Sequence, residues 1–234
     1  NVKCWGEQIG LGYSGVNIGD EAGEMGASLP IVDFGTNPEN ADLPHTIKSY
    51  SGSGNHGCVV LEDNRIRCWG NNQYFGHLGG PNVVESYQTA DIIGESVDLL
   101  DRKEPGTVNG LGVTRLTVDK IGVNSQGGCF LVSDGTMKCF GWNNSGATLN
   151  TGSSQLNGDS TPYIDLGTSD GSTPHTVKDF VTFGENTRAY CAQLDDDRLK
   201  CWGSGSDGLT GAGHESNLGN DILETGNGLH YVDL

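Results

Sequence analysis

Cysteine is the residue whose type and spacing suggest chemistry most clearly in this 234-residue chain. Six of the seven cysteines form pairs ten residues apart, namely Cys58 with Cys68, Cys129 with Cys139, and Cys191 with Cys201. Paired cysteines can bind a metal or form a disulfide. Zinc sites favour cysteines two to four residues apart, and one pair per unit does not complete a set of four ligands. We therefore expect structural disulfides and no metal at these positions.

The ten-residue spacing fits a β-hairpin closed by a three-residue turn, such as Glu62-Asp63-Asn64. In that register Val60 faces Ile66 and the first cysteine lies directly opposite the second. Opposed residues of an antiparallel pair are about 4.5–5.5 Å apart at Cα, a distance that a disulfide spans. Each such bond is worth about 2–3 kcal/mol. Disulfides in every unit predict an oxidising compartment, so we expect an extracellular or cell-surface protein.

Two other polar groups are candidates for binding or modification. Asp20, Glu21 and Glu24 lie close together in the sequence, and clustered carboxylates can bind Ca²⁺. They lack the spacing of a calcium loop, so a solvated loop is the alternative, and we expect no other cofactor. Asn143 begins a glycosylation sequon, Asn-Asn-Ser, and is either a glycan acceptor or a turn residue.

The remaining motifs do not indicate catalysis. Residues 203–208 match the Gly-x-Gly-x-x-Gly dinucleotide fingerprint, but no helix-forming segment follows, and phosphate binding by that motif depends on a helix N-terminus. His45 and His175 both occur in the sequence Pro-His-Thr, and a histidine that recurs with a repeat indicates a structural role. The chain contains no nucleophile elbow, zinc-protease helix or phosphate loop. We expect a protein that is not an enzyme.

The cysteine pairs belong to a longer internal repeat. A Cys-aromatic-Gly sequence ends each hairpin and recurs at Cys4, Cys68, Cys139 and Cys201, with spacings of 64, 71 and 62 residues. Cys4 should therefore pair with a cysteine ten residues upstream, outside this chain. Residues 230–234 match residues 162–166 and 30–34, which are followed by a further strand and hairpin. We expect the chain to begin and end within a repeat unit.

Composition and charge exclude several classes of partner. Acidic residues outnumber basic residues by 30 to 13, for a formal net charge of −17, and no basic patch interrupts this excess. Such a chain repels nucleic acid and anionic membrane surfaces. No apolar stretch approaches the roughly 20 residues that span a bilayer. With 38 glycines and only 34% hydrophobic residues, the chain favours short strands joined by turns.

The string Cys-Trp-Gly-Asn-Asn-Gln-Tyr-Phe-Gly-His-Leu-Gly at residues 68–79 resembles the regulator of chromosome condensation repeat. The paired cysteines and residues 18–35 are most similar to the alpha-tubulin-suppressor-related subset of that family. The resemblance implies an all-β fold, a β-propeller with four-stranded and usually seven blades, of which this chain supplies about three and a half. The division that we expect is 1–6 (end of an upstream blade), 7–70, 71–141, 142–203 (three repeats) and 204–234 (a partial fourth).

Two classes of function remain open. The first is a non-catalytic extracellular scaffold that binds protein or glycan, or other copies of itself, through variable loops around 7–30, 71–95 and 203–228. The second is an enzyme or enzyme inhibitor whose site is shared with missing blades. The polar residues recur at equivalent positions of the repeats and do not cluster at one position that differs between repeats. This distribution favours the scaffold.

Overall fold

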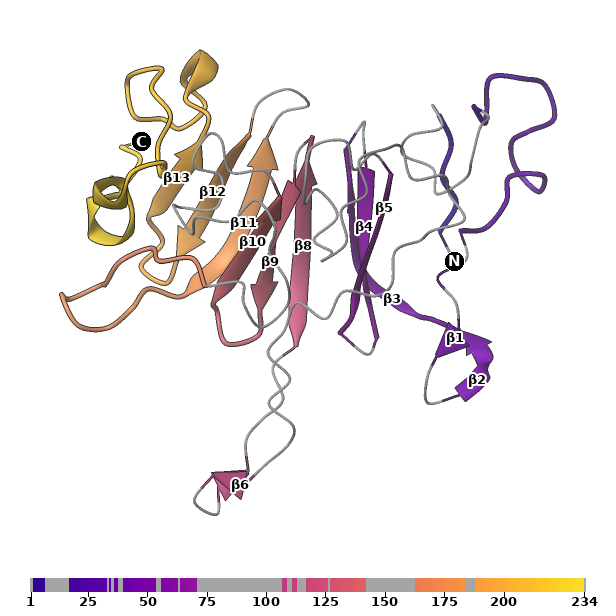
Figure 1. Ribbon diagram of the computed structural model, residues 1–234, viewed down its shortest axis with the longest axis horizontal. Helices are drawn as coiled ribbons and strands as arrows, with labels where there is room; N and C mark the ends of the chain where they lie inside the picture. Colours follow the sequence, from indigo (N-terminus) through magenta and orange to yellow (C-terminus); the bar gives the residue numbers. More distant parts are fainter. Residues whose placement is uncertain are drawn as a thin grey trace.

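Figure 1 shows the computed structural model of the chain. It describes residues 2–6, 17–32, 34, 36–37, 40–53, 56–62, 64–70, 107–108, 111–112, 117–125, 127–141, 163–183 and 188–233. The expected glycosylation residue Asn143 and the expected loop 71–95 lie outside these residues.

Three antiparallel sheets of three strands each form the frame, as the all-β prediction requires. In chain order they are β3 (Ile47–Gly52), β4 (His56–Leu61) and β5 (Ile66–Gly70); β8 (Val118–Asn124), β9 (Gly127–Val132) and β10 (Met137–Gly141); and β11 (Val177–Phe183), β12 (Ala189–Leu194) and β13 (Leu199–Gly203). In each sheet the middle strand pairs with both neighbours. Each sheet thus consists of one strand (β3, β8 or β11), called the inner strand from here on, followed by one of the predicted hairpins.

The hairpin turns have the predicted three-residue geometry. The third turn residue is left-handed in each, with φ of 68° at Asn64, 81° at Gly135 and 67° at Asp197. Asparagine, aspartate and glycine tolerate this conformation, which closes a three-residue hairpin. The amide of Asn64 donates to the carbonyl of Leu61 at 2.9 Å, and the other two turns repeat this bond. Local sequence therefore fixes the register of each hairpin.

That register places the cysteines opposite each other. Cys58 faces Cys68, Cys129 faces Cys139 and Cys191 faces Cys201. Each pair forms a disulfide, with Cα atoms 4.0 to 4.1 Å apart. These are the pairs that the spacing predicts.

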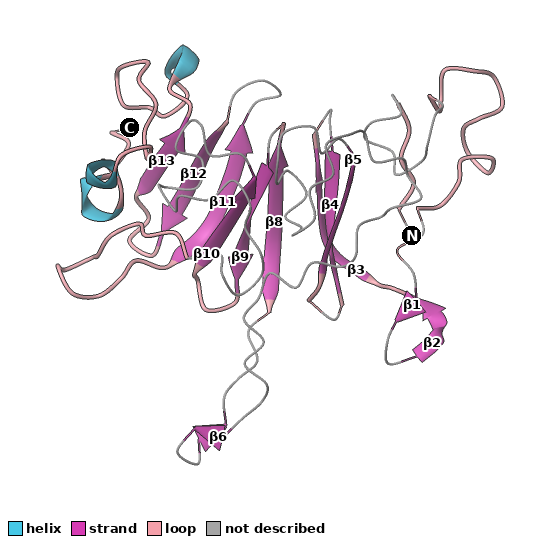
Figure 2. Cartoon of the chain, viewed as in Figure 1, coloured by secondary structure: helices cyan, strands magenta, loops and turns pink. Residues whose placement is uncertain are grey.

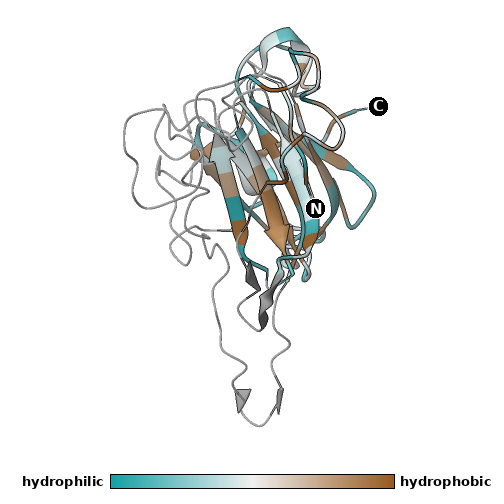
Figure 3. Cartoon of the chain, turned by 90° about the vertical axis from the view of Figure 1, so that its right-hand side faces the viewer, coloured by the Kyte–Doolittle hydropathy of each residue, from teal (hydrophilic) through white to brown (hydrophobic). Residues whose placement is uncertain are grey.

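The three sheets stand in a row, face to face, and the apolar core lies between consecutive sheets (Figure 1). Alternation along each hairpin produces this arrangement, because successive side chains point to opposite faces of a strand. Cys58 and Val60 face the next sheet, where they meet Ile121 and Phe130. Val59, Leu61 and Trp69 point to the opposite side and pack with other residues, including Val32 and Phe34. Figure 3 shows brown, apolar stretches along the strands, with teal and white bands between them.

Among the described residues each of these three sheets has three strands, so the predicted four-stranded blades are not confirmed. At two hairpins the chain returns to the outer edge through isolated bridges, Lys138 with Tyr163 and Lys200 with Tyr231. Between the bridges at Leu218 and Tyr231 the chain forms two short 3-10 turns, η4 (Ile222–Glu224) and η5 (Gly226–Gly228). These turns separate the two bridges along the edge of β13.

The other elements are short. They are β1 (Thr36–Asn37) paired with β2 (Asn40–Pro44), β6 (Thr107–Val108) paired with β7 (Leu111–Gly112), and the 3-10 turn η3 (Ser206–Gly208). Strands and loops dominate Figure 2, and the helical pieces are single turns near the C-terminal end. Within the described ranges, no helix has the length and apolar character needed to cross a membrane.

Candidate functional site

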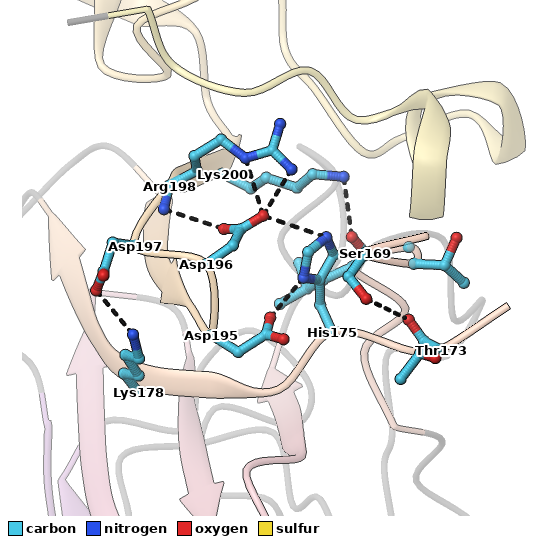
Figure 4. A network of polar contacts seen from close by, with 12 residues as sticks. Ser169, Thr173, His175, Lys178, Asp195, Asp196, Asp197, Arg198 and Lys200 are labelled. Atoms are coloured by element: carbon cyan, nitrogen blue, oxygen red, sulfur yellow. Dashed lines mark hydrogen bonds and ion pairs between the residues drawn. The ribbon is translucent and has the colours of Figure 1, made fainter. Parts of the chain in front are cut away.

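A network of polar contacts lies where the turn of the third hairpin meets the segment that leads into β11 (Figure 4). The turn connects β12 to β13 and carries Asp195, Asp196 and Asp197 in succession. His175 precedes β11, and the returning C-terminal segment brings Tyr231 beside β13. Three parts of the chain that are distant in sequence therefore meet at this cluster.

His175 is the centre of the network. Its side chain is fully buried, and Nδ1 lies 2.6 Å from Oδ1 of Asp195 while Nε2 lies 2.9 Å from the hydroxyl of Tyr231. With the proton on Nδ1, the ring donates to Asp195 and accepts the Tyr231 hydroxyl proton. Both nitrogens are then satisfied within the fold.

Arg198 closes the network on the solvent side. Its guanidinium donates from Nε and one terminal nitrogen to Oδ2 of Asp196, at 2.9 and 2.6 Å. The same terminal nitrogen donates to the Tyr231 hydroxyl at 3.0 Å, and the guanidinium carbon lies 3.6 Å from the centre of the Tyr231 ring. The paired donors of arginine suit a carboxylate, and its flat face suits an aromatic ring.

Lys200 is a second basic residue that contacts Tyr231. It is 1% exposed, and its Nζ donates to the carbonyls of Leu166 and Gly226 at 2.9 Å each. Nζ also lies 4.6 Å from the Tyr231 ring centre. Burial lowers the pKa of Lys200 because the charged ammonium is disfavoured away from water. The lysine joins its own hairpin to two loops, which is a structural task.

The charges in the cluster stabilise each other. The hydrogen bond from His175 lowers the pKa of Asp195, and the hydrogen bonds from Arg198 lower the pKa of Asp196. Asp196 in turn raises the pKa of Arg198. These shifts follow from donors that favour the ionised carboxylate, so both aspartates are anions at neutral pH.

His175, Asp195 and Asp196 also form the one group of described residues with the geometry to hold a metal ion, with ligand atoms within 4.8 Å of one another. Arg198 already forms an ion pair with Asp196, and the positive charge of the guanidinium would repel a cation bound there. A histidine hydrogen-bonded to both an aspartate and a hydroxyl also resembles the oriented base and nucleophile of an enzyme that uses nucleophilic catalysis. In this protein the hydroxyl is the phenol of Tyr231, and it accepts a bond from Arg198 as well.

The same contact recurs in the first repeat. Nδ1 of His45 lies 2.9 Å from Oε1 of Glu62, the first residue of the β4–β5 turn, and Arg65 approaches Nε2 of His45 at 3.4 Å. His45 is 8% exposed, as is His175. A buried histidine that binds the turn acid in two repeats fastens the hairpin tip to the inner strand, the structural role that the Pro-His-Thr repeat predicts.

The predicted calcium residues do not converge. Asp20, Glu21 and Glu24 form no group of three ligand atoms comparable to the one at His175. Oε2 of Glu24 accepts the backbone amides of Gly19 at 2.7 Å and Glu21 at 3.1 Å. These bonds lower the pKa of Glu24 and use the carboxylate to close its own loop.

Residues 203–208 do not lead into an α-helix. Their second half, Ser206–Gly208, is η3, a single 3-10 turn. The helix N-terminus on which phosphate binding by the dinucleotide fingerprint depends is therefore not formed there.

Sequence reasoning identified the histidines but missed Tyr231 as the partner of His175, and Arg198 and Lys200 as the partners of Tyr231. A signal was present, because Lys200 matches Lys138 and Tyr231 matches Tyr163 in the repeat alignment. The second pair repeats the contact between them, with Nζ of Lys138 4.6 Å from the Tyr163 ring centre. Which carbonyls such a buried lysine reaches depends on loops that vary in length, so spacing alone does not reveal it.

The protein is an all-β repeat protein. Its sheets pack in series, each contains a hairpin closed by a disulfide, and similar polar contacts recur between repeats. Residues 47–75, which include β3, β4 and β5, match the "Regulator of chromosome condensation (RCC1) repeat". These residues therefore form a repeat of this type, and the three disulfides of the chain are consistent with the cysteine-bearing subset of such repeats. It matches no curated protein sequence.

Solved structures share the fold, and two of them are described here. Human WBSCR16 has a TM-score of 0.59 and 16% identity, with 99% of this chain covering 48% of that one. Yeast RCC1 (Prp20), solved bound to Kap60, has a TM-score of 0.51 and 14% identity, with 98% of this chain covering 43% of that one. The chain thus spans less than half the length of either relative. At these identities the likeness defines the fold alone.

Proposed function

We propose that this protein is a non-catalytic interaction scaffold that works outside the cell. A rigid repeat frame, part of a β-propeller with four-stranded and usually seven blades, would display loops that bind protein or glycan partners or other copies of the protein. The in-register disulfides support this location, because such bonds persist in oxidising compartments.

One observation carries the proposal: two equivalent loops have the same frame and different tips. In one loop Ile18 bridges to Gly6, and Oε2 of Glu24 accepts the amide of Gly19 at 2.7 Å. In the other loop Leu218 bridges to Gly203, and Oε2 of Glu224 accepts the amide of Gly219 at 3.1 Å. Each frame is closed by a glutamate five residues after its glycine.

The tip of the second loop exposes large apolar side chains at two positions where the first loop has small residues. Ile222 and Leu223 are 69% and 80% exposed, whereas the equivalent residues of the first loop are Ala22 and Gly23. Large apolar side chains held in the solvent gain free energy when a partner covers them. A constant frame with a variable, apolar tip is the arrangement of a binding loop on a scaffold.

The charge of the chain narrows the partner class. With a net charge of −17, tight partners are basic proteins, glycans bridged by cations, or copies whose contact is apolar. The relative yeast RCC1 was solved with a bound protein, Kap60, which supports protein binding as a use of this fold.

The test is binding by the double variant Ile222→Ser/Leu223→Ser, with Ala22→Ser in the equivalent loop as the matched control. The probes are purified extracellular proteins, a glycan array and the protein itself in sedimentation, each with calcium and with a chelator. We expect the double variant to weaken at least one interaction by about tenfold or more, as loss of an apolar anchor does. The control should bind as the unaltered protein does.

The enzyme alternative makes the opposite prediction. If binding survives the double substitution while His175→Asn abolishes a turnover without unfolding the protein, the scaffold proposal is wrong. A mass shift on glycosidase treatment would separately show whether Asn143 carries a glycan.

A further inference from the structure

The apolar tip formed by Ile222 and Leu223 is held in place by side chains at both of its ends. At the start of η4, Oδ1 of Asp221 accepts the amide of Leu223 at 2.9 Å. At the end of η4, the hydroxyl of Thr225 donates to the carbonyl of Ile222 at 2.9 Å. A fixed tip loses little conformational entropy when a partner covers it, so the two exposed side chains are suited to act as an anchor.

Carboxylates border this tip on both sides. Asp221 immediately precedes Ile222, and Glu224 immediately follows Leu223. The whole segment around the tip lies beyond β13 at one end of the row of sheets (Figure 1). Residues 204–233 contain no lysine or arginine and five acidic residues, namely Asp207, Glu215, Asp221, Glu224 and Asp233.

Two basic side chains approach this segment without neutralising it. Lys200 donates to the carbonyl of Gly226 at 2.9 Å, but it is only 1% exposed. Arg198 donates to the hydroxyl of Tyr231, and its charge is paired with that of Asp196 at 2.6 Å. The apolar tip is therefore presented within a negatively charged surface.

This local charge favours one of the three partner classes that the net charge alone leaves open. A second copy carries the same net charge of −17, which opposes its approach to the tip. A glycan bridged by calcium requires about six to eight oxygen ligands, whereas one oxygen of Asp221 and one of Glu224 already bind amides of their own loop. A basic protein is attracted by both carboxylates while it covers the apolar pair.

We propose that the tip docks into an apolar pocket of a positively charged extracellular protein. Ile222 and Leu223 fill the pocket, and lysine or arginine side chains on its rim face Asp221 and Glu224. This inference rests on the proposed scaffold function and names the partner class of its loop. Charge then controls how fast the complex forms, and the buried apolar pair controls how long it lasts.

The test uses a variant that removes charge and keeps the shape of the loop. In Asp221→Asn/Glu224→Gln, asparagine and glutamine each retain an oxygen that accepts the same backbone amide. The matched control is Glu21→Gln/Glu24→Gln, which removes two charges at the equivalent positions of the first loop. All of these side chains are at the surface, so we expect unchanged thermal unfolding of both variants.

The probes are purified extracellular proteins, one set basic and one set acidic, measured by surface plasmon resonance. We expect the proteins that bind to be basic, and the charge variant to slow association about threefold or more at low salt. The effect should shrink as salt screens the charges, and the control should associate as the unaltered protein does. Ile222→Ser/Leu223→Ser should instead speed dissociation about tenfold.

The outcomes separate this proposal from the scaffold function on which it rests. Acidic proteins that bind through Ile222 and Leu223, or association that the charge variant leaves unchanged, would overturn the basic partner and leave the scaffold standing. Failure of every basic protein to bind would also overturn it. Binding that survives Ile222→Ser/Leu223→Ser would overturn both the basic partner and the binding loop.

Discussion

Hydrogen bonds from neighbouring donors set the ionisation of individual carboxylates, and Asp170, on the loop beside the His175 network, shows this most clearly. Its Oδ1 accepts the amide and hydroxyl of Ser172, at 2.9 Å each, and the amide of Thr173 at 2.7 Å. Its Oδ2 accepts the Thr173 hydroxyl at 3.0 Å. These bonds hold the pKa of Asp170 well below its usual range.

Asp170 therefore makes stability depend on pH with a defined sign. Its pKa is lower in the folded protein than the value of about 3.9 in the unfolded chain, so its ionisation stabilises the fold above about pH 4 and loses that effect as the pH falls further. We expect Asp170→Asn to lower the free energy of unfolding at pH 6, and the gap from the unaltered protein to narrow towards pH 2. Urea unfolding across this range is the measurement.

The matched control is Glu215→Gln on an exposed loop, which should leave the curve close to that of the unaltered protein. Unfolding curves for Asp170→Asn and the unaltered protein that stay parallel from pH 6 to pH 2 would contradict the assignment.

Among the elements, the first two hairpins place a glycine opposite an aromatic residue, Gly57 opposite Trp69 and Gly128 opposite Phe140. A Cβ on Gly57 of β4 would lie 2.6 Å from the ring of Trp69 on β5. Gly57→Ala should therefore destabilise the protein by about 1–3 kcal/mol, the usual cost of overpacking a core. Thermal or urea unfolding measures this change.

Gly52→Ala on β3 is the control, because its nearest neighbour would be a carbonyl oxygen 4.0 Å away. If both substitutions cost the same, backbone preference and not the Trp69 contact determines the effect.

The elements also show what sequence could predict. The hairpins were predictable because turn residues such as Asn64 and Asp197, and the cysteine spacing, act over a few neighbouring positions. The path of the chain beside β13 was not, because the bridge at Leu218 and the 3-10 turn at Ile222–Glu224 depend on loop contacts. The partners of His175 were missed for the same reason: Tyr231 is 56 residues away, and a single sequence gives no measure of such contacts.

In the whole molecule, the sheets are joined through their inner strands as well as through apolar cores. The amide of Val123 on β8 donates to the hydroxyl of Ser51 on β3 at 3.0 Å, and the carbonyl of Val123 accepts from Thr182 on β11 at 3.0 Å. Lys120 on β8 also donates to Asp179 on β11 at 2.6 Å. Each sheet thus needs its neighbours, as expected when repeats bury their apolar faces only by stacking.

The central claim is that each of the three complete hairpins is closed by its own disulfide, and peptide mapping without reduction tests it most directly. A basic residue lies between the two cysteines of each hairpin, so trypsin cuts each loop and leaves two peptides joined by the disulfide. The account predicts Cys58 linked to Cys68, Cys129 to Cys139 and Cys191 to Cys201, with each pair separating on reduction. Links between different repeats would contradict the hairpin register, and free thiols at these six positions in the native protein would contradict the extracellular scaffold.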